Sequence, residues 1–139
     1  MNKELQTKIF AQFPKLFDLE NKTAPISAWG IECRDGWYQL VFDLCAELQQ
    51  YVNDSKCKQI VILQAKEKWS ALRVYLGNLP NEIGYAGDLE NIIDKYERLS
   101  QKTCESCGTS DKKDKVTQNS DGWILTLCEK CRKDRSTIK

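Results

Sequence analysis

Apolar residues recur at helical spacing in two stretches of the first half of the chain. The first predicts a helix over residues 2–13, which Pro14 ends or kinks because its ring clashes with the preceding turn. The second predicts a long helix over residues 37–52, and we expect the Asp35 carboxylate to cap its first turn. Its apolar positions follow at steps of three and four: Trp37, Leu40, Val41, Leu44, Cys45, Leu48, Tyr51 and Val52. Residues 21–34, between the two helices, predict loop and irregular chain.

The pattern then changes to runs of β-branched residues, which are typical of strands. Residues 58–66 and 71–76 predict two strands, and the short connection between them predicts a β-hairpin. Alternation in the first strand predicts Ile60 and Ile62 on one face of the hairpin. The same alternation predicts Val61, Leu63 and Ala65 on the other face.

A third helical stripe covers residues 82–102 and leads directly into a cysteine-rich end. Gly84 and Gly87 weaken the first turns of this helix, which makes Asp88 an alternative starting point. No flexible linker separates the helix from the first of the cysteines. We therefore expect the cysteine-rich end to be attached through the helix.

Four of the cysteines form two C-x-x-C pairs: Cys104 and Cys107, then Cys128 and Cys131. The spacing within a pair lets both sulfurs face one metal ion, and the residues between the pairs are enough to run out and back as a hairpin. This arrangement is typical of a zinc ribbon. Four sulfur ligands leave no open position for water or substrate, so we expect one Zn²⁺ with a structural role.

The residues between the pairs support the ribbon. Residues 116–118 predict its outgoing strand and residues 123–127 its returning strand, with a tight turn at 119–122 because Asp-Gly favours hairpin turns. Gly108 follows the second cysteine, where a left-handed backbone is common. The short basic tail after Cys131 predicts a frayed, solvated end.

The predicted fold class is therefore α+β: two N-terminal helices, a β-hairpin, a third helix and a C-terminal zinc ribbon. Residues 1–102 would form the α+β body, and residues 103–139 the zinc-ribbon module with its basic tail. A module of that size cannot bury enough apolar surface to fold without its metal.

The composition of the chain excludes several classes of function. The chain has 21 basic and 20 acidic residues, a formal charge of +1, so no global field attracts nucleic acid or an anionic membrane. It has no histidine, which excludes zinc sites with histidine ligands and the Ser-His and Cys-His nucleophile pairs. We expect a cytoplasmic protein, because no signal peptide or bilayer-spanning apolar run is visible. Cys45 is expected to be a buried, unreactive thiol.

Three segments together resemble a group of small uncharacterised proteins encoded by bacteriophages and prophages. The segments are residues 32–37 (ECRDGW), residues 66–75 (KEKWSALRVY) and the paired C-x-x-C motifs. The group has a C-G-D-G-W step and a K-E-K-F-G-x-L-R-F-Y strand pair, so this chain has Arg34 in place of a glycine and Trp69-Ser70-Ala71 in place of a Phe-Gly pair. The resemblance implies an accessory protein of a mobile element in a bacterial host cell, and it implies no activity.

The candidate binding residues are Arg73, Lys66, Glu67 and Glu32. The hypothesis is that they converge on one polar surface that binds a host protein without catalysis; the alternative is that they are the solvated face of a hairpin. Arg73 is favoured because its guanidinium can hold a carboxylate or phosphate with two hydrogen bonds.

Two other functions remain open. One is a nucleic-acid-binding regulator, in which the ribbon and its basic residues follow phosphates: Lys130, Arg132, Lys133 and Arg135. The less favoured one is a histidine-free enzyme that uses Glu32 or Glu67 as acid or base.

Overall fold

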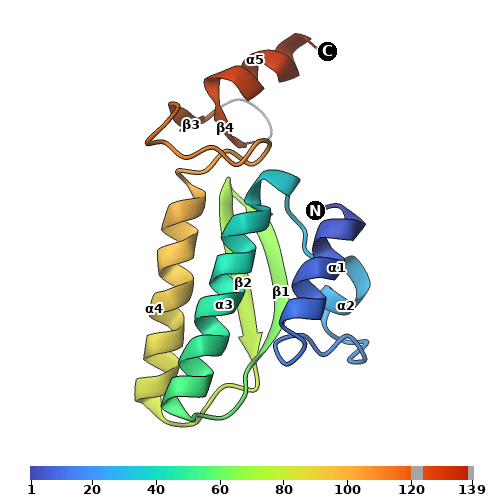
Figure 1. Cartoon of the computed structure of the whole chain (residues 1–139), viewed down its shortest axis with the longest axis vertical. Helices are drawn as coiled ribbons and strands as arrows, with labels where there is room; N and C mark the ends of the chain where they lie inside the picture. The colour runs from blue at the N-terminus through green and yellow to red at the C-terminus, as the bar shows by residue number, and fades with distance from the viewer. Residues whose placement is uncertain (120–123, 138–139) are drawn as a thin grey trace.

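A β-hairpin lies at the centre of the fold, with two long helices over one of its faces (Figure 1). The structure is a computed structural model and describes residues 1–119 and 124–137; for residues 136 and 137 it describes the backbone only. Strand β1 (Val61–Lys68) pairs antiparallel with β2 (Ala71–Gly77), and α3 (Tyr38–Ser55) and α4 (Ile83–Ser100) pack together in front of them. The predicted mixed α and β class is confirmed.

The first long helix, α3, follows the predicted stripe. Its buried residues are Val41, Leu44, Cys45, Leu48 and Val52. The predicted cap is wrong: residues 35–37 form a 3-10 turn, and α3 has no side-chain cap. The Asp35 carboxylate instead accepts hydrogen bonds from the Asn2 backbone amide at 2.7 Å and from Asn2 Nδ2 at 3.0 Å. Asp35 therefore fixes the N-terminal segment to the start of α3.

Helix α1 (Lys3–Gln12) lies where the sequence predicts it. The side chain of Asn2 caps it by accepting the Leu5 amide at 2.9 Å, and the helix ends just before Phe13 and Pro14. A short helix that the sequence analysis did not predict, α2 (Pro25–Trp29), packs beside β1 and begins with a proline at its first position. Proline is favoured there because it lacks the backbone amide proton, which would have no hydrogen-bond partner in the first turn of a helix.

The predicted pair of strands is present, although β1 covers residues 61–68 where residues 58–66 were predicted, and the predicted faces are wrong. A β-bulge between Ile62 and Gln64 adds one residue to β1. Because strand side chains alternate, the extra residue moves Ala65 to the face of Ile62. Ile60, Ile62 and Ala65 are all buried, whereas Val61 and Leu63 are half-buried. The turn at Trp69 and Ser70 has positive φ at both residues, 55° and 62°, without a glycine.

Helix α4 begins at Ile83, close to Glu82 and ahead of the alternative start at Asp88. A Cβ at Gly84 or Gly87 would meet no other atom within 4 Å, so both glycines face open space. Buried Leu89 and Tyr96 face the core. The Tyr51 hydroxyl donates to the Asp88 carboxylate at 2.6 Å, which ties α4 to α3.

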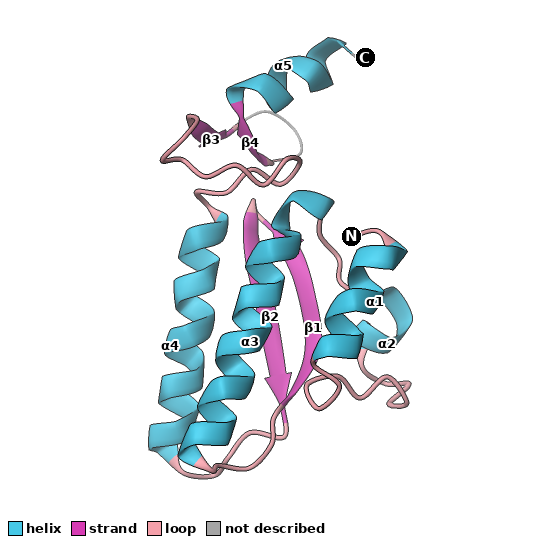
Figure 2. Ribbon diagram, in the orientation of Figure 1, coloured by secondary structure: helices cyan, strands magenta, loops and turns pink. Residues whose placement is uncertain are grey.

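The C-terminal part, which we call the cysteine module, comprises residues 103–119 and 124–137. Strand β3 (Val116–Gln118) pairs antiparallel with β4 (Thr126–Cys128), and α5 (Glu129–Thr137) follows directly (Figure 2). The expectation of a frayed tail is wrong for residues 132–137, because they belong to α5, and the remaining two residues lie outside the described part of the chain. The predicted turn over 119–122 and the start of the returning strand at Trp123 fall largely on residues 120–123, outside the described residues. None of the helices in the described part of the chain is long and apolar enough to cross a membrane.

Candidate metal centre

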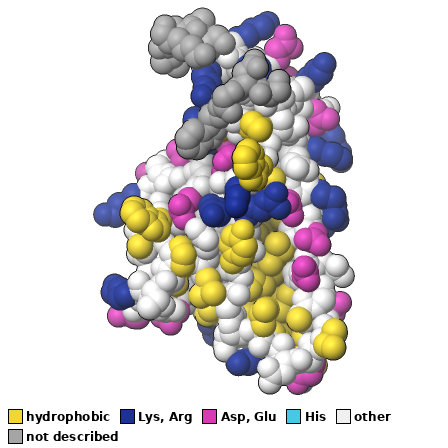
Figure 3. Space-filling model, turned by 180° about the vertical axis from the view of Figure 1, so that it is seen from behind, with side chains coloured by type: hydrophobic (Ala, Val, Ile, Leu, Met, Phe, Trp, Pro, Cys, Tyr) yellow, Lys and Arg dark blue, Asp and Glu magenta, His cyan; other side chains and the backbone are white. Residues whose placement is uncertain are grey.

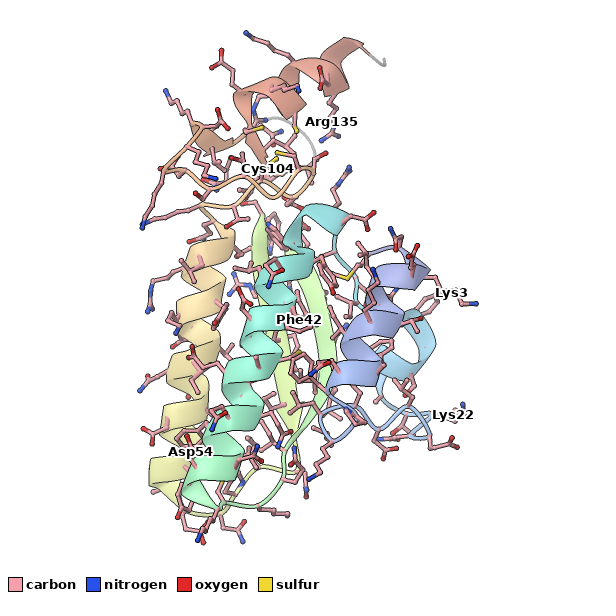
Figure 4. All side chains as sticks on the ribbon, viewed as in Figure 1. Lys3, Lys22, Phe42, Asp54, Cys104 and Arg135 are labelled. Carbon is pink, nitrogen blue, oxygen red and sulfur yellow. The ribbon has the colours of Figure 1, made fainter. Side chains whose placement is uncertain are left out.

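Four cysteine sulfurs converge in the cysteine module (Figure 4). The Sγ atoms of Cys104, Cys107, Cys128 and Cys131 all lie within 4.8 Å of one another. Cys104 and Cys107 belong to the turn after α4, Cys128 ends β4, and Cys131 lies in the first turn of α5. All four are free thiols, and the 3.8 Å between Cys107 and Cys128 is far longer than a disulfide bond. The predicted ligand set is thus brought together in a group that could hold a metal ion.

Backbone hydrogen bonds shape the turn that carries the first two cysteines. The Gly108 amide donates to the Cys104 carbonyl at 3.0 Å, and the Cys104 amide donates to the Thr109 carbonyl at 2.9 Å. Gly108 has φ of 81°, as the sequence predicts for the residue after the second cysteine. Only glycine adopts this conformation without a steric cost. The turn therefore aims both sulfurs at the same point.

The thiols differ in their electrostatic surroundings. Burial favours the neutral form of Cys104, but backbone amides, Cys107's foremost among them, donate to its sulfur and the net effect lowers its pKa to about 7. Burial together with neighbouring thiol groups raises the pKa of Cys107 and of Cys131. Four thiolates this close repel one another unless a cation neutralises them. The donor set therefore fits a divalent metal ion.

The centre is packed against the body. The Gly36 amide donates to the Glu105 carbonyl at 2.8 Å, and a Cβ on Gly36 would lie only 2.4 Å from that oxygen. The indole Nε1 of Trp37 donates to the Thr103 carbonyl at 2.9 Å. The resemblance motif at residues 32–37 thus includes the two residues that meet the cysteine turn. The division into a body and a module at residue 102 stays a prediction.

A buried carboxylate, Glu105, was not singled out by the sequence analysis. It is 1% exposed, and its Oε2 accepts the Thr126 amide at 2.5 Å, which joins the cysteine turn to β4. Burial raises its pKa to about 7, the Thr126 amide opposes the rise, and the nearby Glu67 adds to it. A glutamate inside a C-x-x-C pair gives no signal in a sequence, because the exposed and buried cases look the same.

The candidate binding residues divide between two concave surfaces. Glu32, Lys66 and Glu67 line a polar pocket of about 480 Å³ beside Glu105, and the side chain of Trp29, 73% exposed, also lines it. Glu32 joins β1 through a parallel bridge to Lys66. Arg73 lines the second surface instead, although it is the cross-strand neighbour of Lys66. Its guanidinium is paired with Glu97 of α4.

The second surface is a groove between β2 and α4, also of about 480 Å³. Figure 3 shows this side of the molecule, where apolar side chains gather over the lower half and acidic side chains lie at their margin. Leu76, Leu79 and Ile93 are among the apolar residues of the groove, and three acidic residues of α4 line it: Glu90, Asp94 and Glu97.

Two further cysteines lie in the core of the body. Cys33 and Cys45 are both buried, and burial raises the pKa of each to about 12. The expectation that Cys45 is buried is confirmed. A thiol with so high a pKa stays protonated and is a poor nucleophile at neutral pH.

Comparison of the chain with protein-family models, with curated proteins and with solved structures gives no match in any of the three.

Proposed function

We propose that this chain is a small zinc-binding accessory protein that acts without catalysis by binding a partner protein. Its cysteine module is a zinc ribbon whose metal is structural. The phage or prophage setting follows from the resemblance of residues 32–37 and 66–75 and belongs to the same proposal.

The ligand set supports zinc. Four thiolates arranged tetrahedrally favour Zn²⁺ or iron–sulfur chemistry, and a ribbon built from two C-x-x-C pairs is the usual zinc case. With Zn–S bonds of about 2.3 Å, tetrahedral geometry places the sulfurs about 3.8 Å apart. The Cys107–Cys128 distance of 3.8 Å has this value. The four sulfurs would fill the coordination shell, so the zinc would stabilise the fold and would not bind a substrate.

The observation that carries the binding role is the groove between β2 and α4. It combines an apolar floor with charged side chains at its margin, which is the composition of a surface that recognises protein. The polar pocket has carboxylates, but its lining includes no exposed nucleophile next to a base. A binding role therefore fits the two surfaces better than a catalytic role does.

The nucleic-acid alternative has less support than protein binding. In α5, Lys133 pairs with Glu129 at 3.1 Å, and Arg132 donates to the Thr117 carbonyl within the cysteine module. Two of the four basic residues that would follow phosphates are thus engaged with neighbouring groups.

The test is capture from bacterial lysate with tagged, zinc-loaded protein, in the presence and absence of nuclease. We expect a protein in near-stoichiometric amount that survives nuclease treatment and high salt. Retention of nucleic acid alone, with affinity that falls steeply with salt, would support the regulator instead. Retention of neither would remove the proposed binding role.

A further inference from the structure

The two edges of the hairpin differ in how their backbone groups are satisfied. On the outer edge of β1, the Ile62 amide donates to the Leu16 carbonyl at 2.7 Å. Further along, the Ala65 carbonyl accepts the Glu32 amide and the Glu67 amide donates to the Glu32 carbonyl, both at 2.9 Å. Most outward-pointing backbone groups of β1 therefore already have hydrogen-bond partners within the chain.

The outer edge of β2 is satisfied at one end only. Ile62, Ala65 and Glu67 pair across the hairpin with Leu76, Val74 and Leu72. In an antiparallel pair, partners opposite such outward-pointing residues also point outward. The Leu72 amide donates to Ser100 Oγ at 2.9 Å. Within the described residues, no group outside the hairpin bonds the backbone of Val74 or Leu76.

The groove runs along this open edge. Val74 and Leu76 of β2 form one wall, and the half-buried Ala86 and Ile93 of α4 contribute apolar side chains opposite. An unpaired strand edge beside an apolar groove is the setting in which proteins add an extended peptide as a further strand. The backbone supplies the affinity, and the side chains along the groove select the sequence.

The charge of the groove selects basic side chains. Arg73 and Glu97 neutralise each other, which leaves Glu90 and Asp94 without an ion pair in the described part of the chain. A strand places alternate side chains on opposite faces, so every second residue of an added strand would reach one side of the groove. The acidic wall also disfavours nucleic acid, because phosphates would be repelled.

We propose that β2 binds an extended segment of a partner protein as an added strand, with lysine or arginine side chains alternating with apolar ones. This inference rests on the proposed protein-binding function and names the class of segment that is bound. The occupant contributes backbone hydrogen bonds to Val74 and Leu76 and ion pairs to Glu90 and Asp94.

The first part of the test measures amide hydrogen exchange. In the free chain the amides of Val74 and Leu76 should exchange faster than those of Arg73 and Tyr75, which point toward β1. Addition of an acetylated peptide of about eight alternating lysine and valine residues should slow Val74 and Leu76 selectively. Protection that spreads over another surface, or no protection at saturating peptide, overturns the inference.

The second part uses matched peptides and variants in fluorescence anisotropy. Replacing lysine with glutamate in the peptide, or N-methylating every second backbone amide, should weaken binding by about tenfold or more. The double variant Glu90→Lys with Asp94→Lys should lose the lysine peptide to the same extent, whereas Glu20→Lys on an exposed distant loop should not. Equal binding of the lysine and glutamate peptides contradicts the proposed selectivity.

Two controls separate this inference from the function on which it rests. If the lysate partner is retained equally by the double variant and the parent, protein binding stands and the added strand is wrong. If no lysate protein is captured, the proposed function fails whatever the peptide does. A concentration-dependent dimer in sedimentation that the peptide does not dissociate would assign the edge to a second copy and overturn the inference.

Discussion

Gly36 is the residue at which the body and the cysteine module come closest. A side chain there would collide with the carbonyl oxygens of Cys104 and Glu105, at 2.5 and 2.4 Å. Backbone atoms cannot move aside as the end of a flexible side chain can. The glycine of the D-G-W step is thus explained by its close contact with the turn that carries Cys104 and Cys107.

We expect Gly36→Ala to lower the free energy of unfolding by about 1–3 kcal/mol, as overpacking does. The matched control is Gly87→Ala, because Gly87 is helical and has open space around it. That change should raise stability by up to about 1 kcal/mol, since alanine favours helix over glycine. Chemical denaturation of the zinc-loaded proteins measures both. Equal effects at the two positions would show that the close contact with Glu105 is absent.

Thiol reactivity reports burial residue by residue. Cys33 and Cys45 have pKa values raised to about 12 by burial, so at pH 8 only about one molecule in ten thousand carries the reactive thiolate at either site. Cys57 is half-buried. We expect iodoacetamide to label Cys57 first in native, metal-loaded protein, and mass spectrometry identifies the site. Rapid labelling of Cys45 would show that α3 does not bury this thiol.

Substitution of Arg73 tests how the groove between β2 and α4 binds a peptide. Its ion pair with Glu97 is partly exposed, with side-chain exposures of 37% and 26%, so Arg73→Ala should cost no more than about 1 kcal/mol of stability. The change frees Glu97 in the groove, and we expect the lysine peptide to bind at least as tightly as before. Thermal melts and anisotropy check the two statements. A large loss of peptide binding would mean that the guanidinium itself contacts the ligand.

At the scale of elements, the periodic parts of the chain were predictable. The stripe over residues 37–52 and the β-branched runs each bury one face against the same core, so their spacing carries the information. The cysteine spacing likewise predicted which sulfurs meet. These features are local, or depend on four cysteines that lie close enough to share one metal ion.

Three elements escaped prediction for physical reasons. The bulge at Leu63 adds a residue without changing composition, and alternation alone cannot reveal a shift in register. Helix α2 is five residues long, too short to show a period. Helix α5 is almost wholly polar, and its order depends on contacts such as the one between Arg132 and Thr117, which only the fold brings together.

Chelation tests how the elements depend on the metal. Removal of zinc should abolish hydrogen-exchange protection across residues 104–119 and 124–131, because these residues bury little apolar surface without it. The amide of Gly36 should lose protection with them, since its acceptor is the Glu105 carbonyl. Leu40, Leu44 and Leu48 of α3 should stay protected. Loss of protection throughout α3 would show that the body does not fold independently of the cysteine module.

In the whole molecule, the cysteine cluster and the groove occupy different places. The cysteine cluster lies at one end of the molecule (Figure 4), and the groove lies between the outer edge of β2 and α4. The hydrogen bond from Thr126 Oγ1 to the Ser70 carbonyl, at 2.7 Å, links the tip of the hairpin to β4. Under the proposed function, a metal ion in the cysteine module would hold β4, and through Thr126 the tip of the hairpin, in place without contacting a partner.

X-ray absorption at the zinc edge, on protein purified without added metal, identifies the bound ion and its ligands in one experiment. We expect one zinc per chain and a first shell of four sulfurs at about 2.3 Å. That result would confirm the identity of the ion, the donor set and the closed shell together. Nitrogen or oxygen atoms in the first shell, or a zinc content far below one, would contradict the assignment of a structural four-cysteine zinc site.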